Sequence, residues 1–187
     1  MLTSAIITCT LTTRLKDHAK MSAQAAFRTK VLFDTNQLLQ KAKSEEEIFS
    51  LTASQLMKLL NRSLIVYPEQ NGGLGAEQVF GVDGETAQNI FSAPEERDAA
   101  NWTFANKKRS GAGTDSYPDA KGLYLALRTG GGVFGVIGID LSEKPLDAFE
   151  NSVLLSILGE GALAIENRRN ALEKELSLIH ISEPTRL

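Results

Sequence analysis

The stretch KGLYLALRTGGGVFGVIGIDLSEKPLDAFENSVLLSILGEGALAIENRR, residues 121–169, changes its hydrophobic period along its length. Every second residue from Leu123 to Leu127 is leucine, and an apolar run of residues 133–139 follows the glycines at 130–132. Alternation is typical of a strand, and glycines supply the backbone freedom that a tight turn needs. The first half of the stretch therefore predicts two strands joined as a β-hairpin.

The second half of the stretch predicts a helix over residues 145–176. Pro145 fits the first turn, because proline lacks the N–H group that this turn leaves unpaired. Apolar residues then recur every three or four positions, which places them on one face of the helix. They are Leu146, Phe149, Val153, Ile157 and Gly161, with Leu154, Leu158 and Ile165 widening the stripe.

Two helices are predicted near the start of the chain. Residues 15–41 contain no proline or glycine and repeat apolar side chains about every seven positions, which is typical of a long helix. Ser44 and Glu47 form a capping box for a second helix, which we expect to end at Asn61. The expected buried face of this second helix is Phe49, Ala53, Leu56 and Leu60.

Two strands and a third helix are predicted in the middle of the chain. Residues 64–67 and 78–82 are β-branched runs on either side of a glycine-rich turn. Residues 92–95 read SAPE, a capping box with proline in the first turn of the next helix. The cations at 107–109 are expected in its last turn, with Gly111 as the stop.

A more specific motif lies before the hairpin. Residues 102–104 read WTF, residues 110–115 read SGAGTD, and Pro118 follows. This order resembles the W-x-F…AGAGTD…P signature of KdpD-type potassium-responsive sensor histidine kinases. Ser110 and residues 116–117 depart from it.

The hairpin and the last helix resemble the end of a GAF domain. In that family a strand of the type G-V-[ILF]-G-x-[IL] precedes a helix, as residues 132–139 precede Phe149, the leucines at 154–155 and residues 162–167. The resemblance covers residues 2–175.

The resemblance implies an α/β (α+β) fold with a GAF-like antiparallel sheet, flanking helices and long N- and C-terminal signalling helices. It divides the chain into a truncated end of a transmembrane helix at 1–12, a linker helix at 13–43 and a GAF sensory domain with its signalling helix at 44–176. Residues 177–187 are interpreted as a non-native tail, because SLIHISEPTRL resembles the translated sequencing adapter found at the ends of metagenomic fragments.

The resemblance also implies a function. The chain would be the regulatory module of a membrane-bound two-component kinase that controls high-affinity potassium uptake, at the cytoplasmic face of the plasma membrane. Its partners would be a second copy through the flanking helices, the rest of the kinase and a response regulator. The alternative is a freestanding GAF protein that binds a small molecule. A reductase is a third hypothesis, which the cysteine count weakens.

GAF domains that bind small molecules hold them between the sheet and the helices and loops linking its middle strands. The resemblance implies that Trp102, Asn106, Arg109, Thr114, Asp115 and Tyr124 would lie near such a pocket. The alternative for them is core packing and loop structure. Residues 111–115 lack the Gly-Lys-[Ser/Thr] of a Walker loop. We therefore expect a turn that Thr114 and Asp115 fix by bonding to backbone amides.

Composition limits the chemistry further. A net charge of −3 and a pI near 5.5 leave no basic surface for nucleic acid. Cys9 is the only cysteine, and His18 and His180 stand in the linker helix and the tail. Asp147 and Glu150 are expected in the first turn of the last helix, where acidic residues favour the helix dipole. We predict no catalytic residue, no metal and no cofactor, and no kinase activity from this chain, because the phosphoacceptor and ATP-binding domains are missing.

Overall fold

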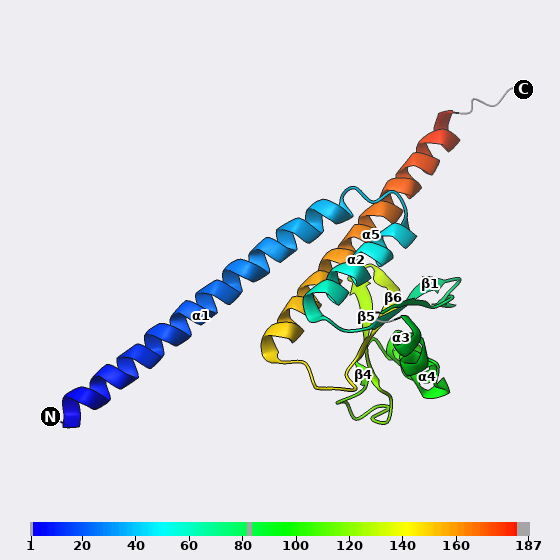
Figure 1. The fold of residues 1–187 in the computed structure, drawn as a ribbon. Helices are drawn as coiled ribbons and strands as arrows, with labels where there is room; N and C mark the ends of the chain where they lie inside the picture. The colour runs from blue at the N-terminus through cyan, green and yellow to red at the C-terminus, as the bar shows by residue number, and fades with distance from the viewer. Residues whose placement is uncertain (1, 82–83, 183–187) are drawn as a thin grey trace, which may run out of the picture. The chain divides into compact units, whose positions relative to one another are not determined.

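The computed structural model describes residues 2–81 and 84–182. The chain divides into two compact units, residues 1–34 and residues 35–187. The first unit is helical and holds most of α1, Leu2–Leu39 (Figure 1). The second unit contains the rest of the fold.

The second unit is built on an antiparallel sheet. Its strands are β1 (Leu64–Gln70), β2 (Gly73–Leu74), β3 (Gln78–Phe80), β4 (Ser110–Gly111), β5 (Gly122–Thr129) and β6 (Gly132–Asp140). The order is β2-β1-β6-β5-β4, and β3 also pairs with β1. β5 and β6 form the predicted hairpin, with Gly122 opposite Asp140 and Thr129 opposite Gly132. The predicted fold class is confirmed.

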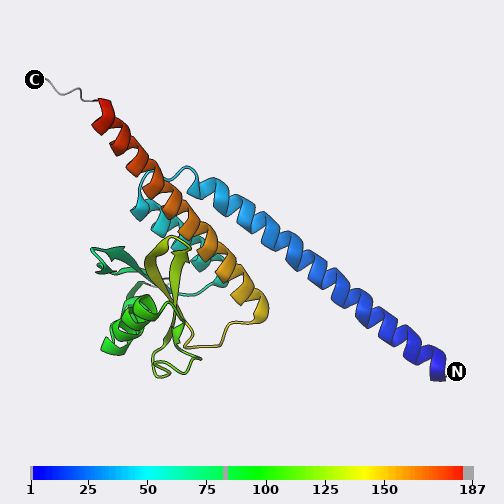
Figure 2. The same cartoon turned by 180° about the vertical axis from the view of Figure 1, so that it is seen from behind.

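Helices cover both faces of this sheet. They are α2 (Glu45–Leu60), α3 (Gly84–Phe91), α4 (Pro94–Asn106) and α5 (Ala148–Ser182). Figures 1 and 2 show α2 and α5 on one face, called here the α5 face, and α3 and α4 on the other, called the α4 face.

The α5 face carries a core of large aliphatic side chains. Leu64 stands opposite Ile139 and Val66 opposite Ile137 across β1 and β6. All four are buried, together with Phe49 and Leu56 of α2 and Leu154 and Ile157 of α5. The apolar residues that recur every three or four positions in the last helix thus form its buried face.

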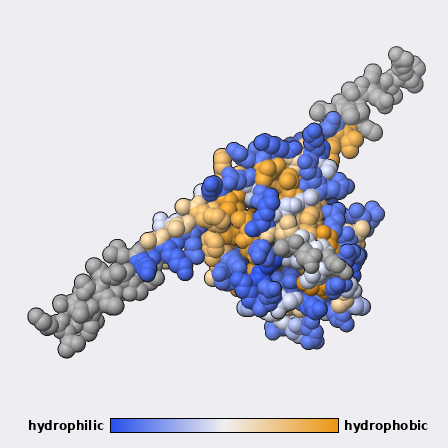
Figure 3. All heavy atoms as spheres, in the orientation of Figure 1, coloured by the Kyte–Doolittle hydropathy of each residue, from blue (hydrophilic) through white to orange (hydrophobic). Residues whose placement is uncertain are grey.

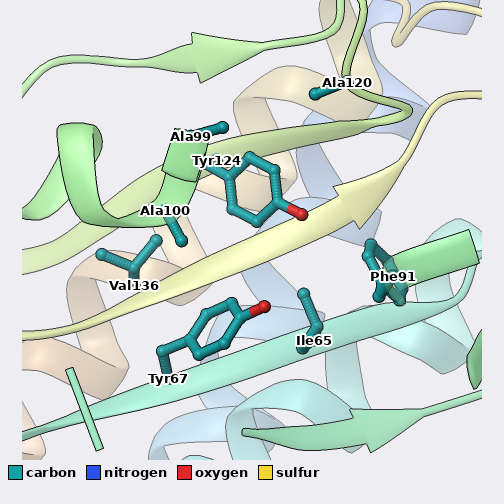
Figure 4. Close-up of a cluster of buried hydrophobic side chains, with 8 residues drawn as sticks. All are labelled: Ile65, Tyr67, Phe91, Ala99, Ala100, Ala120, Tyr124 and Val136. Atoms are coloured by element: carbon teal, nitrogen blue, oxygen red, sulfur yellow. The ribbon is translucent and has the colours of Figure 1, made fainter. Parts of the chain in front are cut away.

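The α4 face carries a smaller core with two tyrosines (Figure 4). Its buried members are Ile65, Tyr67, Phe91, Ala99, Ala100, Ala120, Tyr124 and Val136. Gly138 leaves room for the Tyr124 ring, because a Cβ atom at this position would collide with that ring. β5 is therefore buried on both sides, although only its leucines were predicted as a strand face.

The boundaries of α2 follow the sequence closely. Ser44 is the N-cap, and its hydroxyl accepts a hydrogen bond from Glu47 N at 3.2 Å. Asn61 ends the helix in the left-handed conformation, with φ 51°. Both predictions are confirmed.

The boundaries of α4 differ from the prediction. Its N-cap is Ala93, which makes no side-chain cap, and the Ser92 hydroxyl donates instead to Asn89 O at 3.0 Å. The predicted capping box is wrong, although Pro94 does stand in the first turn. The helix ends at Asn106, and Lys107 is already left-handed, with φ 58°. The cations at 107–109 therefore follow the helix rather than complete its last turn.

The last helix starts three residues later than predicted, at Ala148. Asp147 Oδ1 accepts from Glu150 N at 2.7 Å, and Glu150 Oε2 accepts from Asp147 N at 3.0 Å. Such a reciprocal pair is a capping box, so Asp147 precedes the first turn instead of standing in it. α5 then continues to Ser182, beyond the predicted end at 176.

The predicted ends of the chain remain predictions. The backbone is helical from Leu2 and again up to Ser182, but residues 1 and 183–187 lie outside the described residues, as do the side chains of 2–15 and 178–182. Within the described part, 148–177 is the one helix long and apolar enough to cross a membrane. Much of its apolar surface is buried in the core. Four leucines along α5 are exposed, namely Leu155, Leu163, Leu172 and Leu176. Figure 3 shows that hydrophobic patches interrupt the hydrophilic surface of the molecule.

Candidate functional site

The six predicted pocket residues lie on α4, on either side of β4 and on β5. Tyr124 is fully buried in the core of the α4 face, whereas Trp102 is half-buried on α4. Asn106 is exposed, and its amide donates to Trp102 O at 2.9 Å. Arg109 and Asp115 are exposed and Thr114 is half-buried. The structure thus brings these residues together around α4, β4 and β5, and their role in binding a ligand stays a prediction.

Tyr124 is bound to a carboxylate that the sequence interpretation missed. Glu96 of α4 is 1% exposed, and its Oε2 accepts from the Tyr124 hydroxyl at 2.7 Å. The same carboxylate accepts from Lys121 N at 2.7 Å and from Gly122 N at 3.1 Å. Burial, followed by the bond to Glu96, raises the pKa of Tyr124 well above its usual range.

A signal for Glu96 was present in the sequence. It precedes Ala99, Ala100 and Thr103 by three, four and seven positions, and all four are buried on one face of α4. A charged residue on an otherwise apolar face indicates a buried polar contact. The sequence interpretation instead treated this turn only as a helix cap.

A second polar contact joins α4 to β4. Ser110 is fully buried, and its hydroxyl donates to Ala99 O at 2.7 Å. Because this proton is committed, the Thr103 hydroxyl donates to Ser110 Oγ, also at 2.7 Å. Ser110 stands where the signature has alanine, and its hydroxyl takes part in two buried hydrogen bonds.

The SGAGTD motif forms a closed turn. Gly111 has φ 91°, and a Cβ atom there would collide with Gly122 O, so this position requires glycine. Gly111 N donates to Ser116 O at 2.7 Å. The Thr114 hydroxyl lies 2.8 Å from Gly111 O and 2.9 Å from Ser116 O. The hydroxyl has one proton, which it donates to either of these carbonyls, so Thr114 acts as a donor to the backbone rather than as the predicted acceptor from amides.

Arg97 of α4 contacts the hairpin of β1 and β2 on the α4 face of the sheet. Its guanidinium lies 5.0 Å from the centre of the Tyr67 ring, and its Nη2 donates to Leu74 O and Gly75 O, both at 3.1 Å. Its Nη1 donates to Glu77 at 2.7 Å. Burial raises the pKa of Tyr67 to about 12. The rings of Tyr67 and Tyr124 therefore fill the space between the sheet and α4.

Arg169 of α5 makes the matching contact on the other side of the domain. Its Nε donates to both carboxylate oxygens of Glu45, at 3.0 and 3.1 Å, and its Nη1 donates to Glu69 at 3.0 Å. Its guanidinium also lies 5.2 Å from the Phe134 ring centre. We call Arg169, Glu45, Glu69 and Phe134 the Arg169 junction. It connects α5 with the start of α2, the end of β1 and β6.

Arg62 holds the start of α5. It is 8% exposed, and its Nη1 donates to Asp140 O at 3.1 Å and Lys144 O at 2.9 Å. Its Nη2 donates to Pro145 O at 3.3 Å and lies 3.7 Å from Glu150. The loop before α5 is therefore fixed to the end of α2.

Three cavities lie elsewhere in the second unit. One of about 320 Å³ lies among α5, the start of α2 and residues 36–42, and includes Leu39, Ile48 and Leu163. One of about 500 Å³ borders Arg62, and one of about 450 Å³ borders the Arg169 junction. None of these three is lined by a predicted pocket residue. Among the residues that the structure describes, no group of three His, Cys, Asp or Glu side chains could hold a metal ion.

Comparison with known proteins supports this description. No family model matches the chain. The chain is 30% identical over 182 residues to the sensor protein KdpD of Clostridium acetobutylicum. The matched segment covers 97% of this chain and 20% of that protein. The chain therefore spans about a fifth of the relative that it matches.

Solved structures of GAF domains share the fold, and two of them come from sensor histidine kinases. The GAF domain of the potassium sensor histidine kinase KdpD from Escherichia coli matches with a TM-score of 0.55 and 19% identity, over 79% of this chain and 99% of that one. The GAF domain of a sensor histidine kinase from Pseudomonas syringae pv. tomato matches with a TM-score of 0.58 and 19% identity, over 84% and 97%. The chain is thus a homologue of one segment of the KdpD sensor protein, and it has the fold of a GAF domain.

Proposed function

We propose that the chain is the regulatory GAF module of a two-component sensor histidine kinase and that its output leaves through α5. The observation that carries the proposal is the continuity of this helix. α5 runs unbroken from Ala148 to Ser182, with its start held through Arg62 and a later turn held through Arg169. Residues 171–177, beyond these contacts, are exposed.

A helix of this kind transmits displacement well. Its early turns are part of the core, since Leu154, Ile157 and Ala162 are fully buried. A change in the packing of the sheet must therefore shift or rotate these turns. Because helical hydrogen bonds are local and closely spaced, the exposed turns move with the buried ones.

The parent protein would be membrane-bound, with this module at the cytoplasmic face, and would control high-affinity potassium uptake. It would phosphorylate itself from ATP and pass the phosphoryl group to a response regulator. Similarity to the KdpD of Clostridium acetobutylicum supports this part of the proposal. Exposed apolar side chains on both terminal helices, among them Phe33 and Leu176, support a homodimer through those helices.

The state of the α4 face bears on the kind of input. Tyr67 and Tyr124 fill the region between the sheet and α4, and Glu96 satisfies the Tyr124 hydroxyl. A small ligand would have to displace packed rings and break buried hydrogen bonds. This arrangement supports a module that responds to force or rotation from neighbouring segments, without a bound cofactor.

A segment exchange tests the proposal. Residues 2–175 replace the matching segment of the Clostridium acetobutylicum KdpD, and autophosphorylation from ATP is measured over a range of potassium concentrations. We expect a kinase whose rate still depends on potassium. The matched control carries Leu154→Ala in the exchanged segment, which should weaken that dependence by loosening α5. A potassium-independent rate, equal to that of a kinase from which the segment is deleted, would contradict the proposal.

A further inference from the structure

The hairpin formed by β1 and β2 is held by one arginine from each of two helices. On one side, Arg97 of α4 donates to the carbonyls of Leu74 and Gly75, both at 3.1 Å, while its guanidinium lies over Tyr67. On the other side, Arg169 of α5 donates to Glu69 at 3.0 Å. α4 and α5 lie on opposite faces of the sheet (Figures 1 and 2), so the hairpin is hydrogen-bonded to a helix on each face.

Glu69 connects the turn of the hairpin to Arg169 of α5. Its Oε1 accepts from Gly72 N at 2.9 Å, which fixes the turn of the hairpin, and its Oε2 accepts from Arg169. The bond from Gly72 N, followed by that from Arg169, lowers the pKa of Glu69 below its usual value. One carboxylate therefore bonds the hairpin turn and α5 at the same time.

The turn itself is short. Gly72 has φ 81°, and only Asn71 and Gly72 separate β1 from β2. A displacement of Leu74 or Gly75 therefore cannot be absorbed within the loop and must move Gly72 N. Because charge-assisted hydrogen bonds depend on geometry, the Glu69 carboxylate then loses its position against Arg169.

We propose that the β1–β2 hairpin couples α4 to α5, so that loosening the Arg97 contact loosens the hold of Arg169 on α5. The proposal rests on the proposed function only in taking α5 as the output helix. Arg97 and Arg169 share no bonding partner among the described residues. The free-energy effects of substitutions at two sites without shared partners normally add. Departure from independence is therefore the signature of coupling through the hairpin.

Hydrogen exchange of the 187-residue chain, followed by NMR, measures this coupling. Arg97→Met removes the guanidinium but keeps an aliphatic stem over Tyr67. We expect the amides of the hairpin and those of residues 166–172 in α5 to exchange at least about five-fold faster. Arg109→Met is the matched control, because Arg109 is exposed just beyond α4. It should change neither set.

A second substitution completes the cycle. Glu69→Gln keeps an acceptor for Gly72 N but removes the charge that holds Arg169. We expect Glu69→Gln to raise the exchange rates of the α5 amides. In a chain that carries Glu69→Gln, we expect Arg97→Met to raise these rates by less than about a further two-fold.

Three results would overturn the coupling. In the first, Arg97→Met speeds exchange only in the hairpin. In the second, Arg97→Met has the same effect in the unmodified chain and in the Glu69→Gln chain. In the third, the exchange rates of the β5 amides rise as much as those of α5, which would report global opening. None involves a kinase, so this test can fail while the segment exchange succeeds, and the reverse.

Discussion

The helices on the two faces of the sheet are held by different interactions, apolar packing on the α5 face and buried hydrogen bonds on the α4 face. On the α5 face, Phe49, Leu154 and Ile157 pack from two helices onto aliphatic strand residues. On the α4 face, Ala99 and Ala100 allow α4 to approach the sheet, and Tyr124 is bonded to the buried carboxylate of Glu96.

This difference affects how each helix can move. Apolar packing is non-directional, so α5 can slide or rotate by a small amount without breaking a specific bond in the core. Buried hydrogen bonds are directional and are costly to leave unmade, so α4 is held in one position. The face with apolar packing is thus suited to transmission and the face with hydrogen bonds to anchoring. The predictions below test this contrast.

The largest effect is expected on the α5 face. Leu154→Ala removes a fully buried side chain between α5 and the sheet and should lower the free energy of unfolding by about 2–5 kcal/mol. Chemical denaturation measures the loss. Leu155→Ala, at the exposed neighbouring position, should change stability by less than about 1 kcal/mol. Equal losses for the two variants would show that the packing of α5 is misassigned.

A smaller but more selective effect is expected on the α4 face. Tyr124→Phe removes the hydroxyl that donates to Glu96, which should cost about 1.5–3 kcal/mol because the acceptor is charged and buried. Tyr67→Phe is the control, since within residues 2–81 and 84–182 no bond from the Tyr67 hydroxyl to a carboxylate is described. Its stability should stay within about 0.5 kcal/mol of the unmodified chain. A Tyr67→Phe loss as large as that of Tyr124→Phe would contradict the assigned network.

The same tyrosines predict a loss of stability at alkaline pH. Their pKa values are raised in the folded chain, that of Tyr67 to about 12, mainly because both are buried. Above the unfolded pKa near 10 the unfolded chain loses these protons while the folded chain keeps them, so stability falls as pH rises. Each tyrosine should contribute about 1 kcal/mol per pH unit between pH 10 and 12. Urea denaturation of each Phe variant should show a shallower decline, and identical slopes would argue against burial of the ring.

The smallest effect is expected in the SGAGTD turn. Thr114→Ala removes the hydroxyl that lies within bonding distance of two carbonyls and should cost about 0.5–1.5 kcal/mol. Asp115→Ala, at the exposed next position, should change thermal stability by less than about 0.5 kcal/mol. A larger loss for Asp115→Ala would restore the role in the turn that the sequence suggested for it.

The sequence predicts those parts of the fold whose signal is local. The hairpin of β5 and β6 and the caps of α2 depend on neighbouring residues, and both were identified correctly. The ends of α4 and α5 were displaced because competing local patterns existed. Lysines after a helix resemble lysines in its last turn, and Asp147 fits a cap as well as a first turn.

The contacts of the candidate site could not be predicted in the same way. Glu96 and Tyr124 are separated by 28 residues, and Arg169 and Glu45 by 124. Such pairs are brought together by sheet register and helix packing, which no local pattern encodes. Trp102, which the motif placed near a pocket, is half-buried on α4, and its role in binding a ligand stays a prediction.

The central claim is that the output leaves through α5 as a continuous helix, and helical phase tests it most directly. Alanines are inserted after Lys174, beyond the Arg169 junction, in the kinase that carries this segment, and the rate of autophosphorylation is measured. One inserted residue rotates everything that follows by about 100°, whereas seven restore the phase to within about 20°. We predict that one alanine abolishes regulation by potassium and that seven largely restore it. Regulation that persists equally with one and with seven inserted residues would contradict transmission through α5.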